Sequence, residues 1–411
     1  MNDSFIKNFR QIITLPVVVI AMGYFVDIYD LILFGVVRVE SLMQLGLKGE
    51  ELTSWGTFIL NAQMSGMLIG GILWGILGDK KGRLSVLFAS ILLYSISNFL
   101  NGFITNVEQY AVLRFIAGVG LAGELGAGVT LVAEILPKHL RGYGIMSIAS
   151  FGVLGVVMAN LVANAFDWRN AYIIGGILGL ALLILRFRVK ESSMFCNQNE
   201  KCEVKRGDFF SLFKNKELFI KYIKAIVIGM PLWFVIGILV MFSPEFAKEL
   251  NIQGQVKAGE ALMYAYIGLA FGDFASGYLS QKLQSRKIAF LIFLVLSILS
   301  IAYYYELQNA TLINFYFACF WLGLFSGYWA VFITMAAEQF GTNIRATVAT
   351  TVPNFVRGSV VPITTSFIIL KSYYGILNSA LIVGGVVFLI AFIALYFTQE
   401  TFHKDLDYIE L

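Results

Sequence analysis

The sequence holds few charged residues and very few of the residues that bind metals or form disulfides. Asp, Glu, Lys and Arg make up 14% of the 411 residues, against about 25% in a soluble domain. Two His and three Cys are too few for a zinc site, and Cys196 and Cys202 fall in a predicted cytoplasmic loop where a structural disulfide is not expected. We therefore expect no metal and no cofactor. Both His, His139 and His403, lie outside the apolar runs, so any buried proton site must use carboxylates.

Other absences exclude whole classes of function. No Gly-rich loop followed by Lys-Ser or Lys-Thr is present, which excludes ATP-driven work by this chain. No set of nucleophile, base and metal ligands is visible, so the sequence does not predict an enzyme. Short alternating strand patterns are missing, which excludes a membrane β-barrel. The net charge of +4 gives no indication of a nucleic-acid partner.

Long apolar runs dominate the chain. Apolar residues make up 58% of it, and the mean hydropathy is +0.77. A helix needs about 20 predominantly apolar residues to cross a bilayer. Twelve runs approach or exceed that length, namely 12–37, 55–77, 84–105, 110–136, 143–166, 172–187, 219–242, 262–283, 288–305, 312–337, 348–370 and 376–397. The sequence predicts an all-α polytopic protein with twelve transmembrane helices, held in a lipid bilayer, and we expect a monomer.

The distribution of basic residues predicts the orientation. With the N-terminus inside and an even number of spans, most Lys and Arg fall on the cytoplasmic side. Six fall outside: Arg38, Lys48, Arg169, Lys248, Lys257 and Lys371. Because basic residues are retained inside, this bias predicts that both termini are cytoplasmic, and we expect a bacterial inner membrane. The first apolar run is too long for a signal-peptide core, so we expect it to remain as the first helix.

The chain carries a repeat of half its own length. Four residues recur, each 204 positions later: Gly123, Ala133, Glu134 and Arg141 reappear as Gly327, Ala337, Glu338 and Arg345. Internal repeats of this kind are typical of membrane transporters. We predict a six-helix bundle over residues 1–188, a cytoplasmic linker over 189–218, a second, pseudo-symmetric six-helix bundle over 219–398 and a cytoplasmic tail over 399–411.

Three motifs resemble those of one transporter family. Gly75-Ile-Leu-Gly-Asp79-Lys-Lys-Gly-Arg83 resembles the loop between helices 2 and 3 of the major facilitator superfamily, and the segment from Arg114 to Glu124 resembles its helix 4 motif. The acidic run from Gly23 to Gly35 is most similar to helix 1 of the metabolite–proton symporters. The resemblance implies two six-helix bundles that rock about a central substrate site.

Three carboxylates inside the apolar runs are predicted to bind the coupling proton. Ionisable groups at bilayer depth are costly and therefore indicate function. Asp27 and Asp30 share one face of the first helix, and Asp27 lies roughly 20 Å inside it at about 1.5 Å per residue. Glu124 lies among glycines that allow close helix approach. The alternatives are that Asp30 is solvated or paired with a basic residue, and that Glu124 has a structural role.

The main candidate for substrate binding is Arg357. It lies between Pro353 and Pro362, which free backbone carbonyls that need protein or a water-filled cavity beside them. A guanidinium in such a cavity suits a carboxylate or phosphate. A purely structural ion pair is the alternative. Further candidates are polar or aromatic residues within the runs: Arg114, Asn160, Trp233, Asp273, Tyr328 and Asn354. For Arg114, helix packing or coupling is an equally open interpretation.

A third group of charges lies at the cytoplasmic ends of the runs. It comprises Asp79, Arg83, Glu134, Arg141, Glu338 and Arg345. Ion pairs between the two bundles can close the inner side, and they must break for that side to open. The alternative is a set of solvated salt bridges worth less than ~1 kcal/mol. The resemblance favours the gating role for Asp79 and Arg83.

Together with the resemblance, these residues predict proton-coupled uptake of a small organic acid or zwitterionic metabolite by alternating access, with the proton gradient as energy source. Two alternatives stay open. One is proton-driven export of a metabolite, siderophore or drug, and the other is a nutrient receptor that does not transport. The sequence does not identify the substrate.

Overall fold

The computed structural model describes residues 14–136, 141–186, 209 and 211–402. Helices make up almost all of this part of the chain, and an isolated bridge between Gln253 and Thr311 is the extent of its β-pairing. The predicted all-α class is confirmed.

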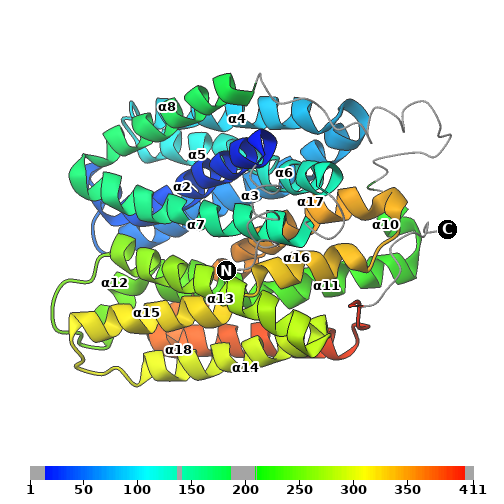
Figure 1. The fold of residues 1–411 in the computed structure, drawn as a ribbon. Helices are drawn as coiled ribbons and strands as arrows, with labels where there is room; N and C mark the ends of the chain where they lie inside the picture. Colours follow the sequence, from blue (N-terminus) through cyan, green and yellow to red (C-terminus); the bar gives the residue numbers. More distant parts are fainter. Residues whose placement is uncertain (1–13, 137–140, 187–208, 210, 403–411) are drawn as a thin grey trace, which may run out of the picture.

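The first half of the chain forms six crossings, drawn from blue to green in Figure 1. One of them is built from two helices, α5 and α6. The elements are α2 (Leu15–Gln44), α3 (Glu50–Lys81), α4 (Arg83–Asn101), α5 (Val107–Leu121), α6 (Glu124–Ile135), α7 (Arg141–Ala165) and α8 (Trp168–Arg186).

The second half repeats this plan and is drawn from green to red. Its elements are α10 (Ser211–Lys214), α11 (Lys216–Phe234), the π-helix η1 (Val235–Val240), α12 (Ser243–Glu249), α13 (Ala258–Leu283), α14 (Arg286–Tyr305), α15 (Leu312–Ser326), α16 (Trp329–Glu338), α17 (Thr342–Gly358) and α18 (Val360–Tyr396).

The helices account for the twelve predicted crossings. Ten stretches of the described residues are long and apolar enough to span a membrane. The last of them, Thr347–Tyr396, is 50 residues long and contains two predicted runs, because the chain leaves the helical conformation at Gly375 with φ 75°. The remaining crossing is α13, which covers the predicted run 262–283 and carries Asp273 within it.

The sequence repeat corresponds to a repeated break in the fourth helix of each half. α5 gives way to α6 at Ala122 and Gly123, and α15 gives way to α16 at Gly327 and Tyr328. A Cβ on Gly327 would lie 2.5 Å from the Cα of Gly272 in α13. The repeated glycine therefore allows another helix to approach the break in the second half.

The motif between α3 and α4 depends on glycine for a different reason. Gly82 is the single residue between the two helices, and its φ of 95° lies in a region that side chains with a Cβ rarely adopt. The chain reverses direction at this one residue.

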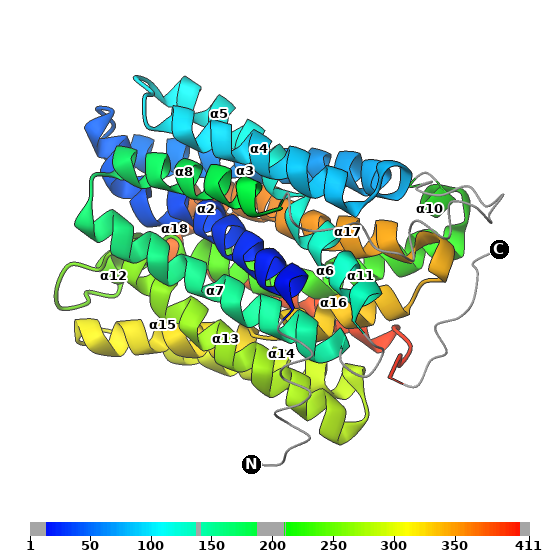
Figure 2. The ribbon, with the colours of Figure 1, turned by 45° about the horizontal axis from the view of Figure 1, so that its top comes forward.

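The two halves pack internally and then against each other. α2 packs on α7 and α3 on α5 in the first half, while α13 packs on α15 and α11 on α18 in the second. The halves meet where α17 lies against α3 and where α13 lies against α7, as Figure 2 shows. We call this interface the seam. The end of the molecule at which α2 ends is the predicted outer face.

Candidate functional site

Asp27 is a buried carboxylate on α2 of the first half. The residue is 0% exposed, and neither carboxylate oxygen has a partner among the described residues. The electrostatic partner that acts on it most strongly is Arg357, followed by Glu124, Asp30 and Arg186. A buried carboxylate without hydrogen bonds is costly, which marks Asp27 as a group that binds something absent from the fold itself.

Arg357 is the counterpart of Asp27 on the other side of the seam. It lies on α17 in the second half and is 1% exposed, and its Nε and Nη1 atoms have no partner in the described part of the chain. Its guanidinium carbon lies 5.9 Å from the ring centre of Trp329. An arginine with free donors beside an aromatic face is arranged to accept an anion.

Aromatic side chains from both halves surround these two charges. Tyr24 of α2 contacts Trp329 of α16 and interacts electrostatically with both Asp27 and Arg357. Tyr266 of α13 interacts with Tyr24 and with Arg357. We call Tyr24, Asp27, Tyr266, Trp329 and Arg357 the central cluster. The sequence analysis did not single out the two tyrosines of this cluster, because no local pattern distinguishes them from packing aromatics.

Asp30 and Arg114 pair with each other inside the first half. Arg114 Nη1 lies 3.1 Å from an Asp30 oxygen, and both side chains are fully buried. Arg114 also donates to Asn98, and its guanidinium carbon lies 4.9 Å from the Tyr172 ring centre. Substrate contact by Arg114 and proton binding by Asp30 are therefore both disfavoured in this arrangement. The packing interpretation of Arg114 fits it.

Glu124 likewise forms an ion pair within the first half, with Arg186. Arg186 Nη1 donates to Glu124 at 3.0 Å and to the Leu87 carbonyl at 2.7 Å, and Nη2 donates to the other carboxylate oxygen. A Cβ on Gly23 would collide with this pair. The structure thus favours the structural role for Glu124.

The burial of Arg186 also differs from the sequence analysis. The prediction of orientation from Lys and Arg positions counts Arg186 among the cytoplasmic residues, yet its side chain is 1% exposed at the end of α8.

Two of the predicted substrate-binding residues form hydrogen bonds with backbone groups instead. Asp273 accepts a hydrogen bond of 3.2 Å from the backbone N–H of Ala330, in the first turn of α16. Asn354 donates to the Ala122 carbonyl at 2.9 Å, across the seam and at the break between α5 and α6. A carboxylate at a helix N-terminus stabilises that terminus. Asp273 therefore holds the break in place, and a direct ion pair with Arg357 is not among its described contacts.

The contacts described for the other three predicted substrate residues do not include Asp27 or Arg357. Asn160 donates to Glu260 at 3.3 Å across the seam. Tyr328 packs on Phe290 of α14, with ring centres 4.4 Å apart. Trp233 is 3% exposed, and its Nε1 has no partner among the described residues. Of these three, Trp233 and Tyr328 each keep a buried polar atom without a hydrogen-bond partner among the described residues.

The predicted gating charges are described only in part. The side chains of five of them lie outside the described residues: Asp79, Arg83, Glu134, Arg141 and Arg345. Glu338 is described, and its partners are Arg286 at 3.4 Å and the Thr401 hydroxyl at 2.7 Å. These two contacts of Glu338 lie within the second half, and the gating role of the six charges stays a prediction.

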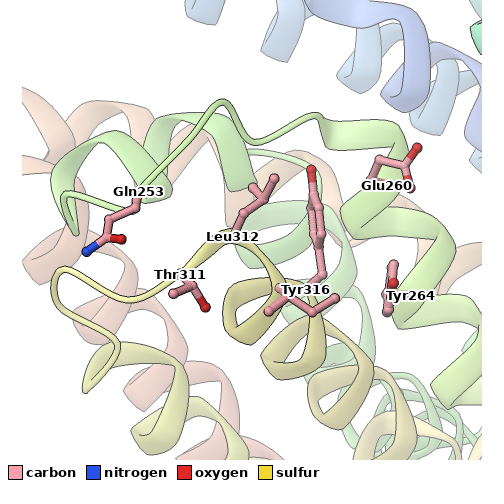
Figure 3. A pocket seen from close by; sticks show the side chains of 7 residues that line it. Gln253, Glu260, Tyr264, Thr311, Leu312 and Tyr316 are labelled. Atoms are coloured by element: carbon pink, nitrogen blue, oxygen red, sulfur yellow. The ribbon is translucent and has the colours of Figure 1, made fainter.

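A separate hollow of about 540 Å³ lies at the predicted outer face of the second half, and Figure 3 shows the side chains that line it. Two of its tyrosines, Tyr264 and Tyr316, stack with ring centres 5.4 Å apart. Glu260 stands at its edge and accepts hydrogen bonds from Asn160 and Asn164 of the first half. The hollow therefore borders the seam but does not contain the central cluster.

Twelve membrane helices in two repeated halves, with buried charges where the halves meet, define a secondary membrane transporter. The chain belongs to the Major Facilitator Superfamily, whose family model matches residues 20–365. It is a multi-pass membrane transporter of small organic substrates.

Known proteins of this kind resemble the chain over most of its length. It is 26% identical to the sialic acid transporter NanX of Escherichia coli (strain K12), over 71% of each chain. It is 22% identical to the 4-hydroxybenzoate transporter PcaK of Acinetobacter baylyi, over 84% of this chain and 82% of the relative. The solved proton:xylose symporter XylE superposes with a TM-score of 0.72 at 19% identity, over 97% of this chain and 98% of that one. The XylE likeness supports the fold.

Proposed function

We propose that this protein imports a small organic acid together with a proton, across a bacterial inner membrane in which both termini face the cytoplasm. One observation carries the proposal. Asp27 of the first half is buried with no hydrogen-bond partner in the part of the chain that the structure describes, and it interacts electrostatically with the incompletely paired Arg357 of the second half.

The charges of this pair explain why anion and proton bind together. In the empty site, the Asp27 carboxylate and the Arg357 guanidinium neutralise each other. A substrate carboxylate that binds Arg357 takes over that role and leaves Asp27 as an uncompensated buried charge. Such a charge is strongly unfavourable, and binding a proton removes it.

The same reasoning gives the stoichiometry. The empty site holds one negative and one positive charge. The loaded site holds a neutral Asp27, a positive Arg357 and a negative substrate. The net charge is zero in both states, so one proton accompanies each singly charged acid. Both states can then reorient across the membrane without moving net charge.

The surroundings of the pair and the named substrates of the relatives support an organic acid. Tyr24, Tyr266 and Trp329 place aromatic rings beside the guanidinium, which suits an anion with an apolar or ring-shaped body. The relatives named above transport sialic acid and 4-hydroxybenzoate, and both compounds are carboxylic acids.

The test begins with purified protein and a thermal-shift screen against 4-hydroxybenzoate, sialic acid, nicotinate, betaines and sugars, because a ligand of the folded state raises its apparent stability. Uptake of the best ligand into proteoliposomes is then measured with an imposed pH gradient. We expect an acidic exterior to drive accumulation, and Arg357→Gln to lose both the thermal shift and the uptake. Uptake that ignores the gradient would refute the coupling, and stimulation only by an acidic lumen would indicate export.

A further inference from the structure

The structure contains one more wholly buried arginine that pairs with a carboxylate, and this pair crosses the seam. Arg38, near the end of α2, is 0% exposed, and its Nη2 lies 2.7 Å and 2.9 Å from the two carboxylate oxygens of Glu245 in α12. The buried pairs of Arg114 and Arg186, in contrast, both lie inside the first half. Rocking of the halves leaves those two pairs intact and must break this one.

The surroundings of Arg38 are shaped to receive its side chain. Its guanidinium carbon lies 4.4 Å from the ring centre of Phe242, which also belongs to the second half. On the other side, a Cβ on Gly56 of α3 would lie 2.9 Å from Arg38 Cδ, so the glycine leaves room for the arginine. Both a carboxylate and an aromatic face of the second half therefore hold one cation of the first half.

The pair is also incompletely satisfied. Arg38 Nε and Nη1 are buried without a partner among the described residues, and Glu245 is 22% exposed. A buried ion pair with orphan donors recovers only part of its desolvation cost. Its net stability is therefore modest, as is required of a contact that breaks in every transport cycle.

The position of the pair fits closure of the predicted outer face. Arg38 lies 11 residues after Asp27 on the same helix, which is roughly 16 Å along its axis. Two weaker contacts cross the seam at the same face, namely Glu260 with Asn160 and Lys371 with Glu50. Glu50 is 86% exposed, so the second of these pairs is solvated.

We infer that Arg38 and Glu245 form the ionic lock that holds the outer mouth shut, and that they must separate before substrate can reach the central cluster from outside. The lock is a property of the scaffold at the seam and needs neither the proton nor the substrate. Its test can therefore succeed or fail independently of the proposed symport.

The test uses a reporter thiol beneath the lock. Thr364 is fully buried and donates a hydrogen bond of 2.7 Å to Asn61 across the seam, so Thr364→Cys reports separation of the halves. Cys196 and Cys202 are replaced by Ser, and the buried Cys319 is kept. A membrane-impermeant maleimide is applied to right-side-out vesicles, with inside-out vesicles as the second arm.

We expect Arg38→Gln and Glu245→Gln each to raise the rate of labelling from outside by about tenfold or more, because each removes the ion pair that joins the halves, and Glu245→Gln also leaves the buried Arg38 charge without its partner. The matched control is Lys371→Gln, which removes the solvated pair across the same seam and should leave the rate nearly unchanged. Glu245→Gln keeps the side-chain shape and carries the test if Arg38→Gln does not fold. Unchanged labelling in Glu245→Gln, an equal rise in Lys371→Gln, or a rise seen only in inside-out vesicles would overturn the lock.

Discussion

We expect the Asp27→Asn variant to keep exchange of substrate across the membrane and to lose net uptake. Asn keeps the size of the side chain but cannot carry the charge that neutralises Arg357 in the empty site. The loaded site of the variant remains neutral, since the substrate anion pairs with Arg357. The empty site acquires a net positive charge. The variant should therefore reorient normally with substrate and poorly without it.

The size of the effect follows from the burial of the pair. Asp27 is 0% and Arg357 1% exposed, and Arg357 is the charged group that acts most strongly on Asp27, so removal of the Asp27 charge leaves the buried guanidinium without that compensation. Leaving a buried charge uncompensated costs about 3 kcal/mol or more, which slows a step that passes through the uncompensated state by at least about a hundredfold. Net uptake includes the return of the empty site, and exchange does not.

The assay compares two measurements on the same proteoliposomes. Uptake driven by a pH gradient should fall by about a hundredfold in Asp27→Asn, while counterflow between two pools of substrate should stay within a few fold of the unaltered protein. Asp167→Asn is the matched control, because Asp167 is an exposed carboxylate at the predicted outer face. Net uptake that survives in Asp27→Asn, or counterflow that is lost with substrate binding intact, would contradict the charge argument.

Two further predictions concern stability. Arg186→Met should lower the free energy of unfolding by about 3–5 kcal/mol, because it leaves the buried Glu124 carboxylate without its ion-pair partner. The double variant Arg186→Met/Glu124→Gln should recover most of this loss, measured by thermal unfolding. Glu400 follows α18, and partial burial alone would raise its pKa. Hydrogen bonds from Ser285 and four backbone N–H groups outweigh this and lower the pKa below the usual value. Its charged form therefore stabilises the fold above its ordinary pKa, and the contribution disappears as pH falls through the folded-state pKa. Glu400→Gln should destabilise the protein at neutral pH and have no effect at strongly acidic pH, whereas a loss that is equal at both would refute the assignment.

The sequence predicts the transmembrane helices of this protein well, because each helix that crosses the membrane corresponds to a long apolar run in the sequence. The offset between Gly123 and Gly327 also anticipates a repeated feature, which proves to be the break in two equivalent helices. Asp27 and Arg357 stand out in the sequence for a related reason. A charge inside an apolar run is expensive wherever the helix packs, so its presence alone indicates a role.

Which of the buried charged residues form ion pairs could not be predicted from the sequence in the same way. Asp30, Glu124 and Asp27 look alike in the sequence, and only the packing of α2 on α5 and of α6 near α8 reveals that Asp30 and Glu124 each have an arginine partner. Arg38 and Arg186 stand near the ends of their runs, where a basic side chain is normally solvated. Tertiary contacts bury both side chains, and the periodicity of the sequence does not predict those contacts.

The first half pairs two of its buried arginines, Arg114 and Arg186, with acids of its own, whereas its buried Asp27 and Arg38 interact with Arg357 and Glu245 of the second half. Charges that complement each other across the seam need no covalent tether to meet. Two polypeptides produced separately, one for each bundle, should therefore find each other in the bilayer through the few seam contacts and restore a working molecule.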